Sequence, residues 1–96
     1  MNLSINIMGF TIENRRFGIV LASDVNPRDG LGWQLFEYTG SRSVLLLEVF
    51  RHDDQKRISF ETFEPVDIPL EALEVVLSSF NTTGGRNFVA DFHDED

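Results

Sequence analysis

The alternation of apolar and polar residues along this chain predicts a series of β-strands followed by one helix. Five segments carry the apolar, β-branched and aromatic pattern of strands. These segments are Ser4–Thr11, Phe17–Leu21, Trp33–Tyr38, Ser43–Arg51 and Lys56–Phe63. The connections at 39–42 and 52–55 are short and polar, as hairpin turns require. Because short connections force antiparallel neighbours, we expect the last three strands to form a meander.

Residues 24–32 separate the first two strands from the last three and are predicted to form a loop. Pro27 fixes its own φ, and the adjacent Asp29 and Gly30 favour a turn. The segment lacks the Gly-Lys-Ser/Thr ending of a phosphate-binding loop, so a plain loop is the better interpretation. Its length makes it a candidate contact loop.

The helix is predicted from the periodicity that begins after Glu64-Pro65. Pro69 suits the first turn, where its missing N–H costs little, and Glu71 complements the helix dipole. One apolar face is expected to hold Leu70, Leu73, Leu77 and Phe80, with Val76 alongside. Residues 81–85 should end this helix of about 12 residues, with asparagine or glycine in the left-handed position.

The chain is therefore predicted to be one α+β domain over residues 1–96. Its expected architecture is an antiparallel four- to five-stranded meander with one C-terminal helix packed on one sheet face. Residues 88–90 could add a short edge strand, and the acidic tail at 91–96 is expected to fray.

Alternation along the strands predicts which side chains share a sheet face. One face is expected to carry Trp33, Leu35, Val44, Leu46, Phe50, Ile58 and Phe60. The other is expected to carry Phe36, Tyr38, Leu45, Leu47, Val49 and Phe63. The second set is mixed with Gln34, Ser59 and Glu61, so neither face is cleanly polar. One helix covers only one face. The second face therefore requires curling of the sheet, a second copy of the chain or a partner.

Several kinds of chemistry find little support in the composition. The chain has no cysteine, which excludes disulfides and cysteine-based zinc sites. His52 and His93 lie in a predicted turn and tail, so no metal site or cofactor is expected. Glu37 and Glu48 could form a catalytic pair, but an ion pair with an arginine or a place at the sheet rim is the plainer account. We therefore expect no catalytic residues and no enzyme activity.

The cellular location of the protein is predicted from two sequence features that it lacks. The N-terminal residues lack the basic start and apolar core of a signal peptide. The longest apolar run, Val44–Leu47, is far shorter than a membrane-spanning segment. The sequence therefore predicts a cytoplasmic protein.

The net charge of −8 arises entirely from residues 61–96, which hold nine acids and only Arg86 as a base. The seven acids and seven bases of residues 1–60 cancel. Such a lopsided field repels nucleic acid and membrane surfaces and attracts basic proteins. A solvated helix face with a solubilising tail is the plain alternative.

We interpret the acidic segment as a binding surface for a basic protein. The partner-binding candidates are the carboxylates of Glu64, Asp67, Glu71, Glu74 and Asp91, with Phe36, Tyr38 and Phe63 as apolar anchors. Charge-assisted hydrogen bonds would give specificity, and an anchor would supply most of the binding energy.

Three stretches carry a resemblance to a known class of proteins. They read Glu48-Val49-Phe50-Arg51, then Ile58-Ser59-Phe60-Glu61-Thr62-Phe63, then Ile68-Pro69-Leu70-Glu71-Ala72-Leu73-Glu74. Over about residues 29–80 the chain resembles small bacterial immunity proteins encoded beside polymorphic or contact-dependent growth-inhibition toxins. The resemblance implies a cognate toxin domain, commonly a nuclease, that is neutralised by tight binding.

Two other functions remain open from the sequence. The first is a homodimeric structural or adaptor domain that pairs through its sheet. The second is a small enzyme or ligand binder with a pocket between helix and sheet. A cavity that holds Glu48 with a second ionisable group would favour the enzyme or ligand-binder interpretation.

Overall fold

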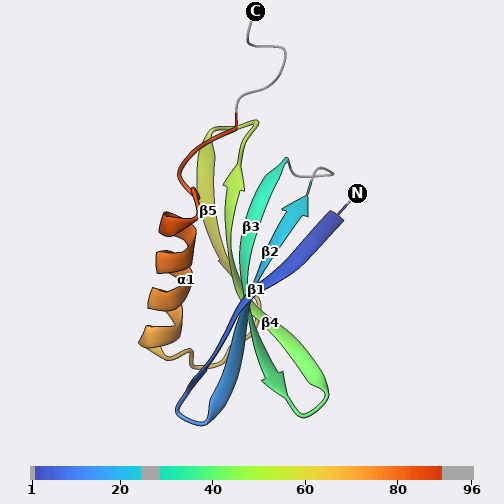
Figure 1. Ribbon diagram of the computed structural model, residues 1–96, viewed down its shortest axis with the longest axis vertical. Helices are drawn as coiled ribbons and strands as arrows, with labels where there is room; N and C mark the ends of the chain where they lie inside the picture. The colour runs from blue at the N-terminus through green and yellow to red at the C-terminus, as the bar shows by residue number, and fades with distance from the viewer. Residues whose placement is uncertain (1, 25–28, 90–96) are drawn as a thin grey trace, which may run out of the picture.

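The computed structural model describes residues 2–24 and 29–89 (Figure 1). Its elements are the strands β1 (Asn2–Ile12), β2 (Arg15–Asp24), β3 (Gly30–Thr39), β4 (Arg42–His52) and β5 (Arg57–Thr62), then the helix α1 (Leu70–Thr82). The strands form one sheet in the order β1-β2-β3-β4-β5, and every neighbouring pair is antiparallel. The predicted α+β meander with one C-terminal helix is confirmed, with five strands.

Tight turns join the strands into hairpins. Glu13 and Asn14, between β1 and β2, both have positive φ values of 55° and 65°. This backbone twist matches the twist of the flanking strands, as in a type I′ hairpin. Gly40, with φ of 61°, turns the chain between β3 and β4. These turns hold consecutive strands next to each other and so produce the meander.

The strands on either side of the predicted loop are longer than expected. β3 begins at Gly30, so Gly30 and Gly32 belong to a strand and the loop prediction is wrong for residues 30–32. Both glycines have partners on β2 and on β4, which hold this stretch extended. A Cβ at Gly32 would overlap the Glu48 carboxylate, so the glycine leaves room for a buried side chain. Residues 25–28 lie outside the described residues.

A β-bulge between β3 and β4 changes the predicted sheet faces. Trp33 pairs with Val49 and Leu35 with Leu47, but Phe36 then pairs with Leu45. Leu46 is the extra residue, and it reverses the alternation beyond it. The assignment of Leu47, Val49 and Phe50 is therefore wrong. Leu47 and Val49 share the face of Trp33, and Phe50 lies on the other face.

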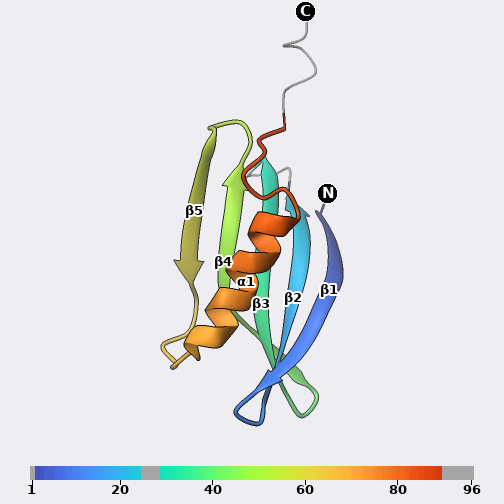
Figure 2. The same ribbon diagram turned by 60° about the vertical axis from the view of Figure 1, so that its left-hand side comes forward.

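The helix packs across one face of the sheet, as Figure 2 shows. The core between the two layers consists of Phe17, Ile19, Trp33, Leu35, Leu46, Leu47, Val49, Ala72, Val76 and Phe80. Trp33 and Phe80 meet edge to face, with ring centroids 4.8 Å apart. The core therefore depends on an aromatic contact that joins β3 to the end of α1.

The helix is rotated relative to the predicted apolar face. Its buried residues are Ala72, Val76, Ser79 and Phe80, whereas Leu70 and Leu77 are 67% and 39% exposed. The small Ala72 and Ser79 allow α1 to lie close to the sheet. The Trp33 Nε1–H donates a hydrogen bond of 2.9 Å to Thr83 Oγ1, whose hydroxyl donates to the Ser79 carbonyl. These contacts set the rotation, which the leucine spacing alone did not predict.

A left-handed glycine follows the end of the helix, as the sequence predicts. Gly84 has φ of 79°, and the Gly85 N–H donates to the Phe80 carbonyl at 2.7 Å. This bond closes the Schellman motif that satisfies carbonyls at a helix end. The expected strand at 88–90 is wrong for Phe88 and Val89, because the Val89 N–H bonds the Asp53 side chain and not a neighbouring strand. Ala90 and the tail at 91–96 lie outside the described residues.

Candidate functional site

The predicted acidic residues lie at the start of the helix and in the segment that leads into it. Glu64 and Asp67 belong to the connection between β5 and α1, and Glu71 and Glu74 to the first half of α1. All four are exposed, and none forms a salt bridge with another described residue. Asp91 lies outside the described residues. The four carboxylates therefore remain available to a partner.

Arg15 comes close to this segment but is committed to another carboxylate. Its Nε and Nη2 donate to the two oxygens of Glu37, each at 2.8 Å. Its Nη1 donates to the backbone carbonyl of Asp67 at 2.9 Å. The bidentate hydrogen bond from Arg15 lowers the pKa of Glu37 and raises the pKa of Arg15 itself. The expectation of an ion pair for Glu37 is confirmed.

Acid should weaken the fold through Glu37. Because its pKa is lowered in the folded state, the Arg15 pair stabilises the protein above the ordinary glutamate value of about 4.3. This stabilisation is lost as the pH falls through the lowered pKa. We expect Glu37→Gln to cost about 1 kcal/mol at pH 7 and almost nothing at pH 2, measured by urea unfolding. Glu64 is exposed and forms no salt bridge with another described residue, so Glu64→Gln should leave the free energy of unfolding unchanged at both pH values.

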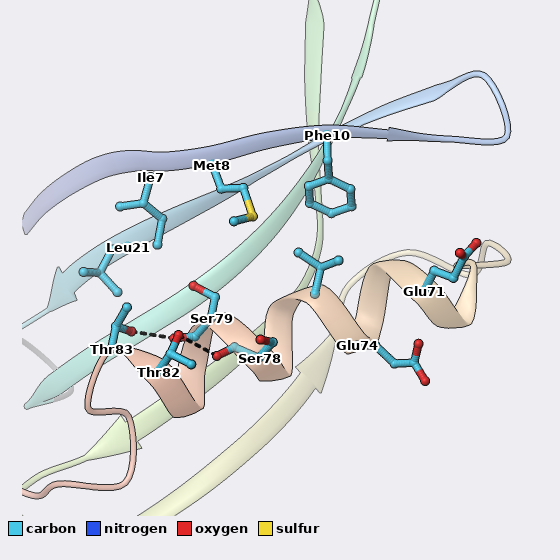
Figure 3. A pocket seen from close by; sticks show the side chains of 11 residues that line it. Ile7, Met8, Phe10, Leu21, Glu71, Glu74, Ser78, Ser79, Thr82 and Thr83 are labelled. Atoms are coloured by element: carbon cyan, nitrogen blue, oxygen red, sulfur yellow. Dashed lines mark hydrogen bonds between the residues drawn. The ribbon is translucent and has the colours of Figure 1, made fainter.

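An open groove runs between α1 and the edge strand β1 (Figure 3). Its volume is about 700 Å³, and its lining is mostly apolar on the sheet side. The side chains of Ile7, Met8 and Phe10 extend from β1 toward the helix. The remaining lining residues are Leu21 of β2, then Glu71, Glu74, Val75, Ser78, Ser79 and Thr82 of α1, and Thr83. Two of the predicted acids therefore border an exposed apolar surface.

The three predicted aromatic anchors do not lie together. Phe36 and Tyr38 alternate with Leu35 and Glu37, which places them on the sheet face away from the helix. Both are half-buried, and the Tyr38 ring covers Gly18 of β2. Phe63 directly follows β5, is 39% exposed and directly precedes Glu64. Only Phe63 is therefore continuous with the acidic segment.

The apolar residues beside Glu71 and Glu74 were not anticipated from the sequence. Ile7 and Met8 are 37% and 45% exposed. A signal was present, because Asn2–Ile12 contains no charged residue. It was not read as a binding surface because an apolar strand is equally typical of a core.

A second, smaller groove of about 260 Å³ lies on the other side of α1. It is lined by Val49, Ile58, Ser59, Phe60, Leu73, Leu77, Phe80 and Arg86. Phe60 is 56% exposed and Leu77 39%. The single helix therefore leaves apolar surface uncovered along both edges of the sheet.

The buried ionisable residues of β4 lie outside both grooves. Glu48 is 3% exposed and accepts a hydrogen bond of 3.0 Å from Gln34 Nε2. His52 is 7% exposed, and its Nε2 lies 2.8 Å from Ser59 Oγ. The register places Glu48 opposite Gln34, on the face away from α1. Glu48 therefore does not provide the ionisable pair that a pocket between helix and sheet would require.

Among the described residues, no group of three histidine, aspartate or glutamate side chains is placed to hold a metal ion. Within the same part of the chain, no helix has the length and apolar character needed to span a bilayer.

The fold and the grooves define a class of structure, a five-stranded antiparallel meander with one helix, open along both edges. No family model, no curated protein and no solved structure matched this chain.

Proposed function

We propose that this chain is a non-catalytic immunity protein that binds and neutralises a cognate, basic toxin domain. A nuclease fits this role, because nucleases need cationic clefts that hold phosphates. The observation that carries the proposal is the set of four exposed carboxylates, Glu64, Asp67, Glu71 and Glu74. None of them is neutralised by another described residue.

The arrangement of these acids supports recognition of a cationic surface. An unpaired exposed carboxylate can accept charge-assisted hydrogen bonds from lysine or arginine. Arg15, the base nearest to Asp67, directs its charge to Glu37. Arg15 also interacts electrostatically with Asp67, but Glu64, Glu71 and Glu74 form no salt bridge with another described residue. Their field would speed association with a basic partner.

The apolar surface next to the acids supports tight binding as well as attraction. Charge alone gives on-rate and specificity, whereas buried anchors supply most of the affinity. The groove beside Glu71 and Glu74 offers Met8 and Phe10 for such contacts, and Phe63 adjoins Glu64. A partner that covered the apolar groove and the adjacent carboxylates would bury apolar area and pair its lysine or arginine side chains with these acids.

The cellular test uses co-expression. The C-terminal domain of the toxin encoded next to this chain should arrest a bacterial host, and this chain should restore growth. If that domain is toxic and the chain gives no protection, the proposed function is wrong.

Charge reversal tests where the toxin binds. Glu71→Lys should weaken binding of the purified toxin domain about tenfold at low salt and reduce its salt dependence, because an attraction becomes a repulsion. Titration calorimetry at two salt concentrations measures both effects. Asp54→Lys makes the same change of charge in the exposed turn between β4 and β5 and should have little effect. Equal losses in the two variants would place the interface away from α1.

A further inference from the structure

The outer edge of the sheet at β1 is long, apolar and uncharged. β1 runs for 11 residues and pairs only with β2, so its other row of backbone N–H and C=O groups has no strand beside it among the described residues. Leu3 and Ile5 are each 61% exposed, and Ile7 and Met8 are 37% and 45% exposed. A strand edge of this kind is a ready template for pairing with another strand.

The two edges of the sheet differ in how they are protected. Natural edge strands usually carry charges or proline, or are kept short. β5 follows this rule, because it has only six residues and includes Arg57 and Glu61. β1 has neither a charged residue nor a proline over its whole length. Its bulge between Asn6 and Met8 is the only protective feature that it shows.

We propose that β1 pairs with β1 of a second copy of this chain, antiparallel and about a two-fold axis, to give one continuous ten-stranded sheet. With the two-fold axis near Ile5, Leu3 and Ile5 of each copy would lie beside the apolar β1 strand of the other copy. Cross-strand apolar pairs are the contacts that stabilise such a sheet. The inference does not depend on the proposed toxin binding.

Charge favours a second copy over a basic partner at this edge. Leu3 and Ile5 do not line the groove that Glu71 and Glu74 border. Lysine or arginine side chains placed beside these two residues would meet no carboxylate on the strand and would lose water without compensation. Two copies carry a net charge of −8 each and repel one another, but that charge comes from residues 61–96. Contact through β1 places no charged residue of one strand against the other, so it is the edge at which two acidic chains can meet.

The mass of the protein in solution tests the proposal. We expect light scattering after size exclusion to give twice the 11.0 kDa of one chain over a concentration series that reaches the millimolar range. Ile5→Lys should raise the dimer dissociation constant by about 100-fold or more, because two lysines then face each other in an apolar seam. Phe60→Lys, at a similarly exposed residue of β5, should leave the dimer intact.

A mixing experiment separates loss of pairing from loss of folding. Ile5→Lys and Ile5→Glu should each be monomeric with the circular dichroism of the unaltered protein, and their equimolar mixture should form dimers. A chain that stays monomeric throughout the series would overturn the proposal. So would a dimer that survives Ile5→Lys or is abolished by Phe60→Lys. Glu71→Lys should not change the mass, which keeps this result separate from toxin binding.

Discussion

Truncation of Phe80 is expected to remove about 3–5 kcal/mol from the free energy of unfolding, as for other buried aromatic residues. Phe80 is 1% exposed and packs edge to face on Trp33. Phe80→Ala would leave a cavity at the only helix–sheet interface of the described residues. A domain of this size has about 5–15 kcal/mol of stability in total, so the variant should be close to unfolding.

A matched control lies on the same helix. Leu77 is 39% exposed, and Leu77→Ala should cost about 1 kcal/mol or less, because less apolar surface is lost and no cavity forms. Urea unfolding followed by circular dichroism compares the two variants. Similar losses would mean that the end of α1 is not part of the core.

Replacement of Arg51 is expected to have an effect of comparable size, about 3–5 kcal/mol, because it leaves a partly buried charge unpaired. Arg51 is 6% exposed, and its Nε lies 2.9 Å from Asp53 Oδ1. That N–H is not aligned as a hydrogen bond, but Arg51 Nη2 donates to Asp53 Oδ2 at 3.5 Å. Arg51 Nη1 also donates to the Gly84 carbonyl at 2.9 Å. Arg51→Met would therefore release the turn after α1 as well.

Two further variants identify the cause of that loss. Arg42→Met, at an exposed arginine of the same strand, should change stability by less than about 0.5 kcal/mol. The double variant Arg51→Met with Asp53→Asn should be more stable than the sum of the single losses predicts, because no lone charge remains. Thermal and urea unfolding measure these values. If Arg51→Met cost no more than Arg42→Met, the pair would not stabilise the fold.

The sequence was sufficient for the fold class because the signals that determine it are local. Short polar connections such as 39–42 dictate antiparallel hairpins whatever lies around them. The end of the helix near Gly84 was predictable for the same reason, since a left-handed residue there favours glycine.

The register and the helix rotation depend on contacts between distant residues, which explains why they were missed. The bulge at Leu46 reverses the faces of Leu47 and Phe50, and no residue type marks it. The burial of Ala72 in place of Leu70 follows from the contact of Trp33 with the helix end. The periodicity of apolar residues shows that α1 has an apolar side, but it does not show which of these residues pack against the sheet.

The candidate site was predicted only in part, and for a similar reason. The charge count identified the acids that the structure leaves exposed, because charge is a property of composition. The apolar residues of β1 that lie beside these acids come from the opposite end of the sequence. Their proximity to Glu71 is a product of the tertiary fold.

The order of elements along the chain has a consequence for biosynthesis. The sheet face that carries Trp33 and Leu35 is completed by β5, but its cover, α1, is translated after every strand. A nascent chain that has emerged only as far as Thr62 therefore presents a complete sheet with one large apolar face exposed to solvent. Such intermediates aggregate or recruit chaperones until α1 covers the apolar face.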